Sequence, residues 1–543
     1  MKPRPKRPKA RPRPGGKPPG KRFAARANEP SEAANKAPAP QERRPSPSAK
    51  PGPKKNEGHR GRSHQGPSKP PRRDGARRPP VRATQGTLPP GAVLVGAPRP
   101  TPNRPTSPDA LHVASVGTLS IAVVAAAELA ERAVFDEHKR GDRAIASALR
   151  LRRDLAAPDH RFVAQAVFAL LRWHGWVEPL QLPRIEERLL LSWILDATTI
   201  HPVCRHWAKL IARDPSRLVA VGDAPNWTAR AEGLKRWVNG RAVNADPWRL
   251  FPDWIRMHLP LPPGGASPKT RSLFLLDALQ RRPLLWVRAQ GRPPEEIWGE
   301  LRDVGVTPWV HRQMTATARL EADCDLYHLE TFKNGFLEIQ DLASQTVGLV
   351  CDPDPGERWW DACAGAGGKA LHLASLMNGR GVVVATDTSE LRLKEAVRRA
   401  RRSPFRNITT KVWDGKGVAG KAKSFDGVLV DAPCSAIGTW RRNPDARWTI
   451  DDQAVGRLAE IQLRLLRAAA DGVKPGGNLV YSVCTITPTE TTGIVRRFLE
   501  ARPEFRLEPF TNPVNNEATD GQLLVWPQDA DSDAMFVAKM TRG

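Results

Sequence analysis

The chain has 543 residues, which at about 150 residues per domain is enough for three to four units. Its net charge of +28 is concentrated at one end, because residues 1–110 hold 27 Lys and Arg against 6 Asp and Glu, together with 26 of the 53 prolines. This composition excludes a single-domain protein and a folded N-terminus, and it favours a polyanion as the partner.

Residues 1–110 are predicted to be a disordered basic tail. Phe23 is their one aromatic residue, so they cannot bury enough apolar surface to offset the chain entropy lost on folding. Two interpretations stay open. The tail is either an arm that neutralises nucleic-acid phosphates without sequence preference, or a solubilising segment with no dedicated partner.

The rest of the chain gives no sign of a membrane or metal protein. No secretory signal is visible at the start, and the most apolar early stretch, Leu119–Leu129, is too short to span a bilayer. The six cysteines form no CxxC pair, which speaks against structural zinc and for free thiols in a reducing compartment. We expect a cytoplasmic protein with no membrane and no metal partner.

Residues 111–245 are predicted to form a helical domain. Apolar residues recur at three- and four-residue spacing in Ile121–Val134 and Phe162–Leu171, and Asp159 is a candidate N-cap for the second helix. Several arginines in this region would line an RNA-facing side or a solvated face equally well. Residues 246–345 mix short strands and helices, with a strand expected at Pro283–Arg288 and a helix at Pro294–Val304.

Residues 346–543 alternate strands with helices, which predicts a doubly wound α/β sheet that binds its ligand at the carboxyl ends of the strands. Strands are expected at Arg358–Ala362, Gly381–Asp387, Ile408–Trp413, Phe425–Asp431 and Asn478–Val483, helices at Lys369–Met377, Glu390–Arg402, Asp452–Ala470 and Pro488–Ala501, and a final antiparallel strand at Ala534–Met540.

A glycine-rich loop follows the first of these strands. It runs from Asp361 to Lys369 (DACAGAGGK), and Asp387 ends the next strand, where a carboxylate can accept hydrogen bonds from a ribose diol. A dinucleotide is possible, but Asp361 would repel a pyrophosphate and suits a cationic ligand such as S-adenosylmethionine. Asp414, after the third strand, is either a contact to the adenine edge or a turn residue.

Two thiols are expected at the carboxyl ends of adjacent strands, Cys434 in DAPCSAIG and Cys484 in YSVCT. Neighbouring strands lie about 5 Å apart, so both thiols would face one pocket. Cytosine C5 is a poor nucleophile until a thiolate adds to C6, and C5 can then attack a sulfonium methyl group. Asp431 is placed to hydrogen-bond the base near N3. The pattern alone leaves open which thiol attacks.

At these two motifs the sequence resembles the RNA cytosine-C5 methyltransferases of the RsmB/Sun/Nop type, from about Phe251 through Arg542. Residues 115–185, especially DHRFVAQAVFALLRWHGW, are similar to the NusB-like RNA-binding domain of the bacterial rRNA branch. The resemblance implies a Rossmann-like class I S-adenosylmethionine-dependent methyltransferase domain, preceded by a small α+β RNA-binding (RRM-like) module and an all-helical NusB-like domain. It also implies a monomer that acts on RNA, with small-subunit rRNA favoured and tRNA open.

The resemblance assigns roles by position. Cys484 would be the nucleophile, Cys434 would assist product release, and Asp431 would orient the base and complete the cofactor pocket. The residues that would bind S-adenosylmethionine are Cys363, Ala364, Gly365, Ala366, Gly367, Gly368 and Lys369, with Asp387 on the ribose and Asp414 near the adenine. Arg441 and Arg442, in RRNPDARW, are predicted to hold phosphates that flank the target.

Three departures from the family pattern and two rival classes remain. Ala366 stands where the family usually has proline, Val483-Cys484-Thr485 replaces Thr-Cys-Ser, and Glu490-Thr491 replaces Glu-Asn. An amino-group methyltransferase would need an Asp/Asn-Pro-Pro-aromatic motif, which DAPC replaces. A non-catalytic ribosome-assembly factor would use the fold only as an RNA-binding scaffold.

Overall fold

The computed structural model describes residues 114–238, 243–321 and 324–543, so the predicted basic tail 1–110 lies outside the described residues. All described residues belong to one compact unit. Among them, no helix is long and apolar enough to cross a membrane. No group of three or more His, Cys, Asp or Glu side chains in this part of the chain is arranged to hold a metal ion.

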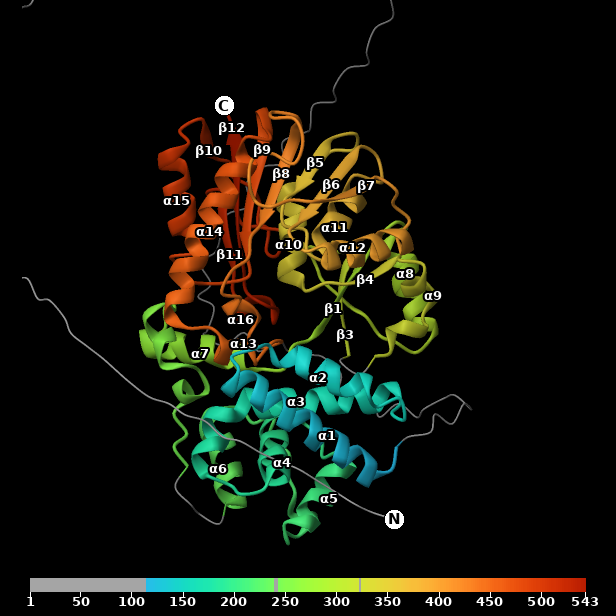
Figure 1. Ribbon diagram of the computed structural model, residues 1–543, viewed down its shortest axis with the longest axis vertical. Helices are drawn as coiled ribbons and strands as arrows, with labels where there is room; N and C mark the ends of the chain where they lie inside the picture. The colour runs from blue at the N-terminus through green and yellow to red at the C-terminus, as the bar shows by residue number, and fades with distance from the viewer. Residues whose placement is uncertain (1–113, 239–242, 322–323) are drawn as a thin grey trace, which may run out of the picture. The chain divides into compact units, whose positions relative to one another are not determined.

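The first described elements are helices around a shared apolar core (Figure 1). They are α1 (Val116–Glu131), α2 (Gly141–Arg150), α3 (Ala157–Val177), α4 (Ile185–Asp196), α5 (Pro202–Leu210) and α6 (Trp227–Trp237), with a π-helical turn at Arg132–Asp136 after α1. The predicted N-cap is wrong by three positions. Ala156 precedes α3, and Asp159 lies in its first turn, where its carboxylate accepts the Ala156 N–H at 3.1 Å.

The middle of the chain forms a four-stranded antiparallel sheet in the order β2-β3-β1-β4. Its elements are α7 (Pro268–Gln280), β1 (Leu285–Ala289), α8 (Pro294–Asp303), β2 (Trp309–Val310), β3 (Thr317–Leu320), α9 (Glu330–Lys333) and β4 (Leu337–Ile339). The predicted strand and helix near residues 283 and 294 are both present, with ends shifted by one or two residues.

The remaining residues build the predicted doubly wound sheet, in the order β10-β12-β9-β8-β5-β6-β7, with β11 paired to β12. The elements are α10 (Leu342–Cys351), β5 (Arg358–Asp361), α11 (Gly368–Leu376), β6 (Val382–Asp387), α12 (Glu390–Arg402), β7 (Ile408–Val412), β8 (Phe425–Asp431), α13 (Ala446–Thr449), α14 (Asp452–Ala470), β9 (Val473–Val483), α15 (Thr492–Ala501), β10 (Phe505–Leu507), β11 (Gln522–Val525), α16 (Pro527–Ala530) and β12 (Met535–Arg542).

The five strands β7, β6, β5, β8 and β9 run parallel, and β12 is antiparallel to β9 as predicted. Two boundaries were misjudged. The strand β9 begins at Val473 instead of Asn478 and includes Gly476 and Gly477. The helix α15 begins at Thr492 instead of Pro488. The register pairs Asp431 with Ser482, which brings the chain ends after β8 and β9 together.

Candidate active site

The glycine-rich loop needs glycine at two of its positions. Gly365 and Gly367 have φ angles of +55° and +83°, which residues other than glycine rarely adopt. A Cβ at Gly367 would also lie 2.9 Å from the Cβ of Ala396. The Gly365 N–H donates to Asp387 at 3.0 Å, and the Ser389 N–H donates to the other oxygen at 2.7 Å. Asp387 therefore shapes the loop and presents its remaining lone pairs at the end of β6.

A second carboxylate, Asp361, is buried at the end of β5 without a hydrogen-bond partner for either oxygen among the described residues. Burial raises its pKa to about 7, and repulsion from Asp431 adds to the effect. Lys369 donates to Asp431 at 2.7 Å. Burial opposes the Lys369 charge, but the Asp431 carboxylate more than offsets this and raises the lysine pKa. Open glycine backbone beside this buried acid, whose charge Lys369 only partly offsets, fits a cationic nucleoside cofactor.

Asp414 is a turn residue in this structure. It is exposed after β7, and its carboxylate accepts the N–H of Lys416 at 3.0 Å. Its predicted contact to an adenine edge stays a prediction, as do the cofactor roles of Cys363, which is half-buried, and of the loop residues around it.

The two predicted thiols do face one another. The sulfur atoms of Cys434 and Cys484 are 3.4 Å apart, and both side chains are half-buried. The hydrogen bond to Cys484 and burial raise the pKa of Cys434 well above its usual value. Cys434 therefore keeps its proton, and either sulfur can be the donor in their contact.

Glu490 joins the two thiol loops, and the sequence interpretation missed this. It is fully buried and accepts the Ser435 N–H at 2.8 Å, the Gln462 amide at 2.9 Å and the Thr487 hydroxyl at 2.9 Å. The hydroxyls of Ser435 and Thr485, which follow the two cysteines, also donate to it. The signal in the sequence was an acidic residue six positions after Cys484 with no basic neighbour.

The prediction that Arg441 holds RNA phosphates is wrong. Its side chain is 1% exposed, and its guanidinium donates to the carbonyl oxygens of Ser532 and Arg282 and to the Asp531 carboxylate. Protein acceptors thus replace the phosphates that the sequence suggested. The neighbouring Arg442 is exposed and pairs with Asp533, so its phosphate contact stays a prediction.

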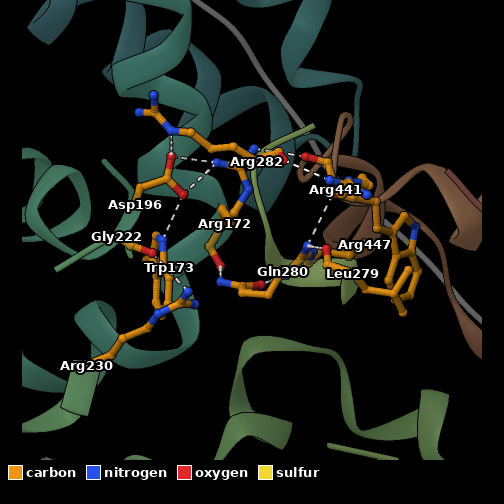
Figure 2. Close-up of polar contacts among 11 residues, drawn as sticks. Arg172, Trp173, Asp196, Gly222, Arg230, Leu279, Gln280, Arg282, Arg441 and Arg447 are labelled. Atoms are coloured by element: carbon orange, nitrogen blue, oxygen red, sulfur yellow. Dashed lines mark hydrogen bonds and ion pairs between the residues drawn. The ribbon is translucent and has the colours of Figure 1, made fainter. Parts of the chain in front are cut away.

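Residues 440–448, the docking segment, join the catalytic domain to the helical domain through buried arginines (Figure 2). The guanidinium of Arg172 on α3 pairs with Asp196 on α4 and donates to the Arg441 carbonyl at 2.9 Å. Arg447 is fully buried and donates to Gln280 Oε1 at 2.7 Å and to the Leu250, Leu279 and Trp440 carbonyl oxygens. The helical domain therefore holds the chain that leads away from Cys434.

Fold and site together define a Rossmann-like methyltransferase that uses S-adenosylmethionine. The family described as 16S rRNA methyltransferase RsmB/F matches residues 348–541. The probable ribosomal RNA small subunit methyltransferase B of Synechocystis sp. is 28% identical over 77% of this chain and 100% of its own length. The ribosomal RNA small subunit methyltransferase B of Salmonella paratyphi C is 31% identical over 55% of this chain and 68% of its own length.

The chain belongs to this RsmB-type family of RNA methyltransferases. Among solved structures, the protein PH0851 superimposes with a TM-score of 0.60 at 23% identity, over 78% of this chain and 98% of that one, which shows the shared fold.

Proposed function

We propose that the protein transfers a methyl group to C5 of a cytosine in small-subunit ribosomal RNA, through a covalent bond between the Cys484 sulfur and C6 of the base. One observation carries the proposal: two thiols lie 3.4 Å apart at adjacent strand ends, next to a glycine loop flanked by carboxylates. Methylation of an exocyclic amine needs no thiol, so this pair supports methylation at ring carbon.

Cys484 is the better nucleophile of the two. Cys434 keeps its proton, because the contact with Cys484 and burial raise its pKa. A protonated Cys434 3.4 Å away can donate to the Cys484 sulfur when that sulfur acts as the attacking thiolate.

Asp431 is proposed to hold the target base through its N3 and exocyclic amino edge. Its Oδ2 accepts from Lys369 and its Oδ1 from the Ser482 hydroxyl at 2.9 Å, so its orientation is fixed before the base enters. Each oxygen retains a further lone pair, which can accept the exocyclic amino group, whereas N3 is itself an acceptor and pairs with the carboxylate only when a proton lies between them. The target must be unstacked or single-stranded for C6 to reach the sulfur.

When bound, S-adenosylmethionine supplies an electrophilic methyl group, and the residues proposed to hold it are Cys363–Lys369, Asp387, Asp414 and Asp431. After transfer, the C5 proton must leave and the bond between sulfur and C6 must break. We propose that Cys434 gives its proton to the Cys484 sulfur as the S–C6 bond breaks and takes up the C5 proton, whose C–H electron pair re-forms the C5–C6 double bond and expels the sulfur. Both sulfurs are then protonated, and one proton passes to solvent when Cys484 returns to the thiolate.

Small-subunit rRNA is the favoured substrate because both relatives are named as methyltransferases of that RNA. tRNA is the alternative. The net charge of +28 is consistent with either nucleic acid. Cytoplasmic localisation, a monomeric state and the absence of a metal remain predictions.

The test is to trap the covalent adduct. Cys434→Ala is expected to accumulate a protein–RNA adduct that survives denaturing electrophoresis, whereas Cys484→Ala forms neither adduct nor 5-methylcytosine. Cys324→Ala, a half-buried cysteine outside the site, is the matched control and should behave as wild type. Adducts in Cys484→Ala but not in Cys434→Ala would reverse the assignment.

Bisulfite sequencing of rRNA and tRNA from a deletion strain identifies the substrate. Loss of one modified rRNA position supports the proposal, and loss confined to tRNA supports the alternative. Cofactor binding with no labelled product on either RNA would support the scaffold interpretation instead.

A further inference from the structure

A cavity of about 320 Å³ lies beside the docking segment. Its wall comes from stretches that are far apart in the sequence: Gln165, Phe168 and Arg172 on α3, Asp196 at the end of α4, the chain from Arg282 to Trp286, and the end of β4 with Asp341. Arg442 of the catalytic domain completes the wall. The volume is within the range of roughly 300–1,000 Å³ that is typical of small-ligand pockets.

The lining combines apolar surface with arginine side chains. Phe168, Leu284 and Ile339 supply apolar walls, and the Ile339 side chain is 41% exposed although it lies on a strand. Arg282 uses its Nε to donate to Asp196, while its Nη2 is buried without a hydrogen-bond partner among the described residues. Figure 2 shows the Arg282 guanidinium beyond Asp196, directed away from Arg441. Asp196 and Asp341 also line the cavity and would oppose a phosphate, whereas a flat heteroaromatic ring with polar edges matches this lining.

The cavity is connected to the thiol pair through short backbone contacts. The Gly438 N–H donates to the Cys484 carbonyl at 3.1 Å, and the Gly438 carbonyl accepts the Ala534 N–H at 2.9 Å. The residue before Ala534 is Asp533, which pairs with Arg442 at the cavity wall. Gly438, Ala534 and Asp533 therefore link the segment that carries Cys484 to Arg442 in the cavity wall.

We propose that this cavity binds a second unstacked nucleobase of the substrate RNA, a close neighbour of the target cytosine, with Phe168 against the base. This inference rests on the proposed function. Unstacked bases are commonly held on aromatic side chains. The helical domain thereby contributes directly to the choice of target.

The experiment places an abasic site at each nucleotide around the target in turn and measures RNA binding by fluorescence anisotropy alongside methyl transfer. For wild type, one flanking abasic site should weaken binding about tenfold. Phe168→Ala should weaken binding of intact RNA by a similar factor and should then be insensitive to that abasic site. Phe274→Ala, an exposed phenylalanine on α7, is the matched control and should retain the wild-type pattern.

Ile339→Trp provides a second variant, because a bulky side chain on the exposed edge of the cavity fills it without removing core packing. It should reproduce the effect of Phe168→Ala with an unchanged melting temperature. The proposal is overturned if the abasic penalty persists in both variants, or if deletion of residues 1–110 changes access to the cavity for a small-molecule probe, since the tail would then be the occupant. Failure of wild type to methylate any cytosine would instead refute the proposed function, because the binding measurement does not depend on turnover.

Discussion

Replacing Glu490 with alanine should both destabilise the catalytic domain and separate the two thiols. The carboxylate is fully buried and accepts five hydrogen bonds from residues that follow Cys434, follow Cys484 or lie on α14. The three hydroxyl donors can rotate toward other acceptors, but the Ser435 N–H and one N–H of the Gln462 amide, whose other N–H donates to the Pro433 carbonyl, would lose their acceptor. At about 1–3 kcal/mol for each unsatisfied buried donor, the expected loss is about 2–6 kcal/mol of unfolding free energy.

Urea denaturation followed by tryptophan fluorescence measures the stability loss, and single-turnover methylation measures its consequence for the reaction. Because a displacement of about 1 Å at a reacting pair can cost about 100-fold in rate, adduct release should slow by a factor of that order. Glu460→Ala is the control, since Glu460 is exposed on the same helix as Gln462 and pairs only with Arg497 in the described part of the chain. If the Glu490→Ala protein has an unfolding free energy within about 0.5 kcal/mol of wild type and releases the RNA adduct at the wild-type rate, Glu490 does not hold the two thiol loops together.

Three further predictions concern other parts of the molecule. Arg447→Ala should cost about 3–5 kcal/mol of unfolding free energy, measured by urea denaturation, because it leaves buried carbonyl acceptors unpaired. Arg457→Ala, at an exposed arginine, should be nearly neutral. Equal effects of the two substitutions would contradict the role of Arg447 in the docking segment. Because the pKa of Asp361 is raised to about 7 in the folded state, the native protein binds one more proton than the unfolded chain between about pH 4 and 7, and its stability falls as pH rises through that window. Asp361→Asn should flatten this fall, which calorimetry at several pH values measures. An unchanged slope in the variant would exclude the pKa shift. Deleting residues 1–110 should weaken RNA affinity and flatten its salt dependence, and an unchanged salt slope would favour the solubilising tail.

Much of the catalytic domain was predictable because its signals are local. Alternating apolar runs predicted the parallel strands, and the helices Glu390–Arg402 and Asp452–Ala470 have their predicted bounds. Parallel strands bring their carboxyl ends to one edge of the sheet, so the meeting of Cys434 and Cys484 followed from topology alone. The strand start at Val473 was missed because two glycines usually end a strand.

Only the tertiary structure decided what the polar residues between these motifs do. Arg441 and Arg442 are adjacent in sequence, and both were assigned to phosphates, yet one is buried against backbone carbonyls from distant segments and the other is exposed. Glu490 is an ordinary glutamate in the sequence and a buried junction in the fold. A charged side chain takes its role from the partners that surround it. Those partners come from distant chain segments, such as Arg172 and Arg441, which are 269 positions apart, so no local pattern encodes the role.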